Sequence, residues 1–163
     1  MAQFDFGLWT KKAYSLKRGT LLRRLTAVDG LQRTIAWAER RGFRVEFKLC
    51  GGECGLCFYE TKVIFVDPRL ALETQLYVLL HECGHALIDS GQRLRRDWPR
   101  GYNAAENGYS TKGHRHMIAV IVEEIEAWNR ARRLATRLNL TLDDEAFNKI
   151  RDKLLKSHIG SVL

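Results

Sequence analysis

The residues best suited to chemistry are two histidines and a glutamate within a short apolar segment. His81, Glu82 and His85 form the pattern H-E-x-x-H inside LETQLYVLLHECGHALI, residues 72 to 88. Apolar residues recur there at helical spacing, so both imidazoles should lie on one face, one turn apart, where they can hold a metal ion. Glu82 lies about 100° around the helix and can reach a water on the metal. The alternative, three ordinary polar residues on a buried helix, requires a hydrogen-bond partner in the core for each.

A third ligand is needed, because a catalytic zinc normally has three protein ligands and one position for water. Three glutamates, Glu123, Glu124 and Glu126, lie in a second segment of helical character, from about 116 to 138. Only Glu124 falls on a row that is otherwise small and apolar. The other members of that row are Val120, Ala127, Ala131, Leu134 and Leu138. A carboxylate on a buried row is costly unless it is paired or binds a metal, so Glu124 is the expected ligand.

These motifs resemble the ImmA/IrrE-type metallopeptidases, a family of small gluzincins. The resemblance rests on HECGH followed by Glu124-Ile125-Glu126-Ala127 and on the order of elements, and it covers about residues 30 to 138. It implies that the first glutamate of the E-x-E-A segment, Glu124, is the third zinc ligand. Trp128 stands where the family usually has Asn. The resemblance further implies a peptide or protein substrate, often a regulatory protein, and a gene of bacterial, phage or mobile-element origin.

Other side chains are candidates for the cleft. His116 precedes Glu124 by eight residues and shares its face if the helix has begun there, and His114 and Tyr109 belong to the long loop before that helix. Any of them could stabilise the oxyanion formed during hydrolysis. SprT-like metalloproteases share HExxH and commonly use a third histidine, so His114 or His116 remains an alternative ligand to Glu124.

The four cysteines do not form the pattern of a secreted disulfide scaffold. Cys50, Cys54 and Cys57 have C-x3-C-x2-C spacing in a glycine-rich turn, but a second zinc would need a fourth ligand that is not adjacent. We expect incidental thiols there, with a structural metal as the alternative. Cys83 points away from the metal face and should be a small core residue.

Composition adds a net charge of +8, from 27 Lys and Arg against 19 Asp and Glu. The basic residues concentrate in three stretches, 11–44, 93–100 and 130–137, which would allow weak association with nucleic acid or an acidic partner. No segment has the length and apolarity of a membrane span, and no apolar run follows a basic start. We expect a cytoplasmic protein of one domain, 1–163.

The elements that must position the candidates are short and alternate in type. Two helices are expected at 16–27 and 31–41, the second with Asp29 as its N-cap, followed by three strands at 44–49, 56–61 and 62–67. After the motif helix and the glutamate helix, a capping box of Thr141 and Asp144 should begin a last amphipathic helix. The sequence therefore predicts an α+β fold, a small three-stranded sheet packed with about five helices, zincin-like in its HExxH helix and following glutamate helix.

The chemistry that best fits is a zinc-dependent peptidase in which Glu82 activates the water. One alternative is a regulatory or nucleic-acid-binding module that holds zinc without turnover. Another is a metallohydrolase acting on a non-peptide amide, which the same ligands would permit.

Overall fold

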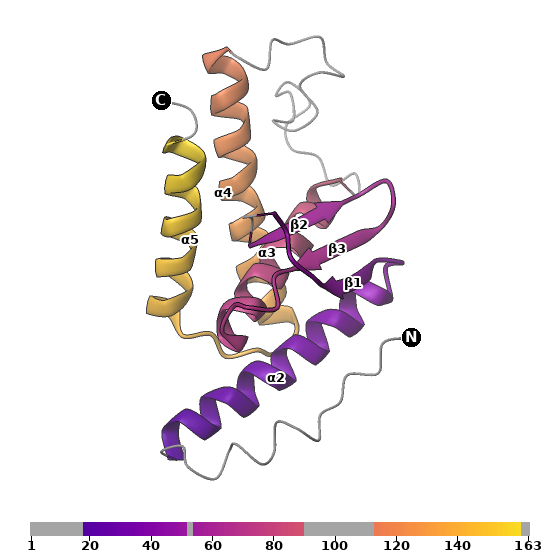
Figure 1. Cartoon of the computed structure of the whole chain (residues 1–163), viewed down its shortest axis with the longest axis vertical. Helices are drawn as coiled ribbons and strands as arrows, with labels where there is room; N and C mark the ends of the chain where they lie inside the picture. Colours follow the sequence, from indigo (N-terminus) through magenta and orange to yellow (C-terminus); the bar gives the residue numbers. More distant parts are fainter. Residues whose placement is uncertain (1–17, 52–53, 90–112, 161–163) are drawn as a thin grey trace.

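The computed structural model describes residues 18–51, 54–89 and 113–160 of the chain. Within these ranges four helices and three strands form the α+β fold expected from the sequence (Figure 1). In chain order they are α2 (Arg18–Glu39), β1 (Arg44–Phe47), β2 (Gly55–Phe58), β3 (Val63–Val66), α3 (Leu72–Asp89), α4 (His114–Arg137) and α5 (Asp144–Gly160). None of the helices described is long and apolar enough to span a bilayer.

The two helices expected before the sheet are a single one, α2, so there are four described helices where about five were predicted. Asp29 does not cap a helix; its carboxylate accepts a hydrogen bond from Arg33, one turn along the same helix. Gly30 lies within the continuous helix against the side chain of Leu76, where a Cβ would come within 2.7 Å of Cδ2. The helix cost of glycine, about 1 kcal/mol, is thus offset by close packing on α3. The apolar spacing of segment 16–27 predicts that Leu25 faces inward, but its side chain is 59% exposed.

The three predicted strands form one mixed sheet in the order β1-β3-β2. β3 is central, paired in parallel with β1 (Val45 opposite Ile64) and antiparallel with β2 (Cys57 opposite Ile64). The side chains of Ile64 and Val66 in β3 are fully buried. β2 is an edge strand, paired only with β3 among the described residues.

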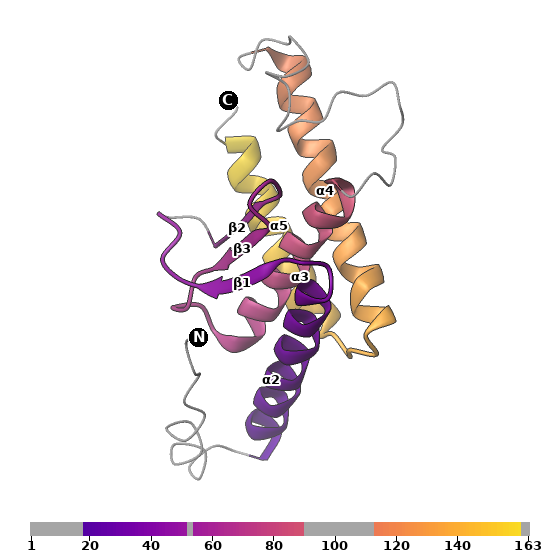
Figure 2. The same cartoon turned by 90° about the vertical axis from the view of Figure 1, so that its right-hand side faces the viewer.

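α3 is the centre of the core, because it contacts the other three helices as well as β2 and β3. Figure 2 shows the sheet on one side of it and α4 on the other. Three consecutive residues, Val78, Leu79 and Leu80, are completely buried, as expected for a helix covered on all sides. Each buried leucine side chain contributes about 1.5–3 kcal/mol of hydrophobic stabilisation.

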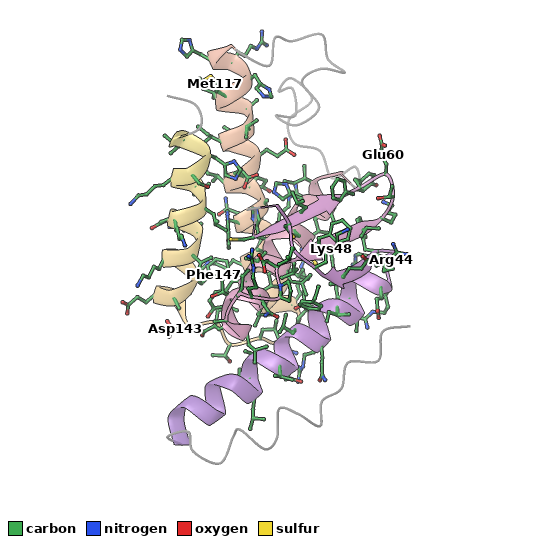
Figure 3. The ribbon with its side chains drawn as sticks, in the orientation of Figure 1. Arg44, Lys48, Glu60, Met117, Asp143 and Phe147 are labelled. Atoms are coloured by element: carbon green, nitrogen blue, oxygen red, sulfur yellow. The ribbon has the colours of Figure 1, made fainter. Side chains whose placement is uncertain are left out.

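The first turn of α5 packs against α3 and α4. The ring of Phe147 meets those of Tyr77 and Trp128 edge to face, with 5.3 Å between centroids in both pairs. Figure 3 shows Phe147 on the side of α5 that faces the other helices. The predicted Thr141 capping box does not form. Asp143 caps the helix instead, accepting a hydrogen bond from the backbone N–H of Ala146 at 3.1 Å.

Candidate metal centre

The two motif histidines lie side by side on α3. Their rings are 4.7 Å apart between centroids, and the two Nε2 atoms are separated by 3.2 Å. Spacing of four residues on a helix produces this arrangement, as the sequence predicted. The indole of Trp128 stacks on the His81 ring at 4.3 Å and an interplanar angle of 21°.

α4 brings Glu124 to this pair. Its carboxyl Oε2 is 3.1 Å from His81 Nε2, and its Oε1 is 3.3 Å from His85 Nε2. The Glu124 side chain is only 2% exposed. Ala127, Ala131 and Leu134 are buried on the same row, so the helix faces α3 as its sequence pattern predicted.

The neighbouring glutamates lie elsewhere on α4. Glu123, expected on a more polar row, is also buried, and its Oε1 is 3.9 Å from His85 Nδ1, the nitrogen on the far side of that ring. Glu126 accepts hydrogen bonds from Arg130 and Arg133, both at 2.8 Å, away from the histidines. The three carboxylates therefore have three different neighbourhoods, and Glu124 alone approaches both Nε2 atoms.

A glycine allows α4 to come this close to α3. A Cβ on Gly84 would lie 2.2 Å from the backbone oxygen of Ala127, 2.9 Å from its carbonyl carbon and 3.0 Å from its Cα. Gly84 lies between the two histidines, and Ala127 is one turn after Glu124. The sequence contained this signal, because a glycine inside a helix otherwise costs about 1 kcal/mol and so suggests a packing requirement.

The distances suit a metal ion. Ligands bonded to a tetrahedral zinc at about 2.0–2.1 Å lie about 3.3 Å from one another. The two Nε2 atoms are 3.2 Å apart, and the carboxylate of Glu124 approaches His81 through Oε2 at 3.1 Å and His85 through its other oxygen, Oε1, at 3.3 Å. Among the described residues, His81, His85 and Glu124 are also the one group of three or more potential ligands that converges, with all ligand atoms within 4.8 Å. Two imidazole nitrogens and one carboxylate oxygen could therefore hold one cation.

Burial and mutual contacts shift the pKa values of all three side chains in the metal-free centre. Burial lowers the pKa of His81 to about 4, although Glu124 acts in the other direction. Burial also disfavours charge on His85, but hydrogen bonding to Glu124 and the charge of nearby carboxylates outweigh it and raise the pKa of His85 to about 9. The pKa of Glu124 is lowered because hydrogen bonds from both histidines outweigh the effect of burial. Of the two histidines, His85 is thus the one whose protonated form the neighbouring carboxylates favour, and Glu124 is the one whose ionised form the histidines favour.

Glu82, the expected base, lies between α3 and the edge strand. A Cβ on Gly55 of β2 would come within 2.7 Å of Glu82 Oε1 and 3.0 Å of Cγ, so the missing side chain of Gly55 leaves room for the carboxyl group. Glu82 is buried. Its carboxyl group therefore lies next to Gly55, shielded from solvent between α3 and the edge strand.

The other predicted cleft residues are not brought to the histidine pair. His114 is the first residue of α4 and is exposed, and His116 is half-buried two turns before Glu124, about 12 Å along the helix. Neither belongs to the converging group, so the structure favours Glu124 over the third-histidine alternative. Tyr109 lies outside the described residues.

One histidine that the sequence did not single out does reach the centre. His158 of α5 places Nε2 3.5 Å from Glu124 Oε2, with its side chain 29% exposed. It continues the row of Ile150 and Leu154 on the amphipathic face of α5, and this pattern was the available signal. Its neighbour could not be predicted, because that depends on how α5 packs against α4.

The cysteines form no second site among the described residues. Cys50, Cys54 and Cys57 do not converge as a group of potential ligands, and none of the four cysteines is in a disulfide. Cys83 is completely buried, and burial raises the pKa of its thiol well above the usual value. Cys83 is thus the small core residue that was expected.

Comparison with known proteins identifies a family for this chain. The family model described as the IrrE N-terminal-like domain, of a peptidase family, matches residues 38–142. No curated protein and no solved structure matches the chain. The matched range contains the sheet, α3 and α4 with all three converging residues, and it ends before α5 begins at Asp144.

Proposed function

The chain belongs to the IrrE N-terminal-like family of peptidases, and from this membership and the geometry of the centre we propose that it is a zinc-dependent metallopeptidase. His81, His85 and Glu124 would hold the metal. The observation that carries the proposal is the convergence of these three side chains, whose ligand atoms, one from each residue, all lie within 4.8 Å of one another. Zinc is the ion of choice, because two imidazoles and one carboxylate are a ligand set of catalytic zinc sites.

When bound, zinc would supply Lewis-acid chemistry, polarising a carbonyl and lowering the pKa of water towards ~7. Glu82 would accept the proton of the attacking water and then deliver it to the nitrogen of the departing amine. Burial of Glu82 beside Gly55 supports this role, because a fixed carboxylate needs little reorganisation. Glu124, charged and almost fully buried, would balance the cation.

The substrate class follows from the family. A peptide or protein is the substrate we propose, and a regulatory protein in the cytoplasm is the narrower proposal. The net charge of +8 favours acidic partners and would also permit weak contact with nucleic acid.

The test compares the parent with Glu82→Gln. Both proteins are loaded with one equivalent of zinc, analysed for metal content and incubated with a mixture of peptides whose cleavage is followed by mass spectrometry. We expect equal zinc in both proteins and a loss of hydrolysis of at least about 100-fold in the variant, because an amide cannot accept the proton. Glu60→Gln, at an exposed turn residue (Figure 3), removes the same charge and should be as active as the parent.

Gly55→Ala gives a second, independent arm. A methyl group there would lie 2.6 Å from Val78 Cγ1 and 2.7 Å from Glu82 Oε1, so both side chains of α3 must shift. We expect zinc to be retained and turnover reduced, because neither Val78 nor Glu82 is a proposed metal ligand. Full activity of Glu82→Gln would show that Glu82 is not the base. A parent that binds zinc but cleaves no peptide would replace the peptidase with a zinc-holding binding module or a hydrolase of other amides.

A further inference from the structure

His158 reaches the metal centre from outside the part of the chain that defines the family. The family match ends at residue 142, whereas His158 lies in the last turn of α5, which runs to Gly160. Phe147 fixes the first turn of α5 against Tyr77 and Trp128, and Arg132 of α4 donates hydrogen bonds to Asp144 and Asn148. His158 stands eleven residues after Phe147, three helical turns, and so returns to the same face. The attachment of α5 therefore directs His158 towards α4.

The contact that His158 makes is with the carboxylate of Glu124. Nε2 of His158 lies 3.5 Å from Oε2, the same oxygen that is 3.1 Å from His81 Nε2. His158 does not belong to the group whose ligand atoms converge within 4.8 Å. It therefore meets the proposed ligand rather than the position of the metal.

A contact of this kind can affect how a carboxylate binds a metal. A glutamate side chain has three rotatable bonds, and carboxylates that bind metals are themselves held by hydrogen bonds from outer residues. Such outer partners typically change metal affinity by about 10 to 100-fold when they are replaced.

We propose that His158 is a positioning residue of the metal centre: its Nε2, 3.5 Å from Oε2 of Glu124 in this structure, would donate a hydrogen bond to that oxygen when the ion is bound and hold the carboxylate in the orientation that binds the ion. The inference rests on the proposed metal centre. It assigns to α5, beyond the family domain, a part in building that centre. The role is one of positioning, exerted through Glu124.

The experiment measures zinc affinity in the full-length chain, by competition with a chromophoric chelator at constant pH. His158→Ala should weaken zinc binding by about 10 to 100-fold. His158→Gln keeps an N–H donor at similar reach and should restore affinity to within about threefold of the parent. Absorption of the cobalt-substituted protein provides a second readout, because a carboxylate that changes its orientation alters the visible bands of His158→Ala but not of His158→Gln.

A control separates positioning from loosening of the helix. Leu154→Ala removes a partly buried side chain one turn earlier on the same row and should leave zinc affinity within about threefold of the parent while lowering the unfolding temperature. Equal zinc affinity in His158→Ala and the parent would overturn the inference and leave the metal centre standing. Equal weakening by Leu154→Ala would also overturn it, since the effect would then belong to the helix. A parent that binds no zinc would remove the proposed function and this inference together.

Discussion

Gly84→Ala provides the most direct test of how the centre is built. In an ordinary helix this change raises stability by about 0.5–1 kcal/mol, because alanine has the higher helix propensity. At Gly84 the new methyl group would meet the backbone of Ala127 at 2.2 Å. Backbone atoms cannot rotate away as the end of a side chain can, so α3 and α4 must separate by about 1 Å to restore ordinary contact. Overpacking of this kind costs about 1–3 kcal/mol, which outweighs the gain in propensity.

The separation also acts on the metal ligands. Glu124 lies one turn from Ala127 and would move with it, so that its present distances of 3.1 and 3.3 Å from the histidine nitrogens would exceed 4 Å after a shift of about 1 Å. A tetrahedral zinc needs about 3.3 Å. We therefore expect zinc affinity to fall by at least about 100-fold, the upper end of what replacement of outer residues costs.

Two measurements decide the outcome, chelator competition for zinc and thermal unfolding of the metal-free protein. The unfolding temperature should fall by about 2–4 °C for each kcal/mol lost. Gly30→Ala is the matched control, because its methyl group would meet only the side-chain end of Leu76, which can rotate, and because it lies in α2. Parent-like zinc affinity in Gly84→Ala, or a higher unfolding temperature, would refute the close helix approach as the basis of the centre.

Further predictions concern the ligands, the proton and the metal. Glu124→Gln should lose the most zinc affinity of the three glutamate variants. Glu123→Gln should lose about 10 to 100-fold, because Glu123 orients the imidazole of His85, and Glu126→Gln should lose almost none. Isothermal titration with zinc measures the three affinities, and a different ranking would contradict the assignment of the ligand. Because the pKa of His85 is raised to about 9, zinc must displace a proton below that pH, so affinity should rise about tenfold per pH unit from pH 7 to 9 and then level off. The metal-free protein should show the opposite trend: the stability contributed by protonated His85 is complete below pH 6.5 and is lost as pH rises through 9, which urea unfolding across pH would detect. Removal of zinc by a chelator should lower the unfolding temperature. Zinc at a thousandfold excess over its dissociation constant stabilises the folded state by about 4 kcal/mol, and this stabilisation is lost with the metal. An unchanged unfolding temperature would contradict metal binding to the folded state.

Local patterns allowed much of this centre to be predicted. The spacing of His81 and His85 needs only a helix, and the apolar row around Glu124 identifies the face that turns inward. The same reasoning found the α+β fold and the three strands. These features depend on residues within one or two turns or strands of each other.

The remaining features depend on contacts between distant segments. Asp29 suggested a helix boundary, but α2 is continuous through it, and the next residue, Gly30, packs against Leu76 of α3. β1 pairs in parallel with β3 and not with β2, the next strand in the sequence, and no local pattern specifies this choice of partner. Trp128 and His158 have their neighbours only because α4 and α5 lie against α3, so their positions required the folded structure.

The spread of the proposed ligands along the chain has a consequence for folding kinetics. The histidines become neighbours as soon as α3 forms, but Glu124 arrives only when a loop of roughly 40 residues has closed, and loop closure costs entropy before any contact compensates for it. A partly folded chain can therefore offer an ion only two imidazoles. The interactions of the ion would then form after the rate-limiting step, so that zinc should slow unfolding strongly while leaving the refolding rate nearly unchanged. Zinc-bound molecules would then persist in the cell because they unfold slowly. Their helices would assemble at the same rate as those of the metal-free chain.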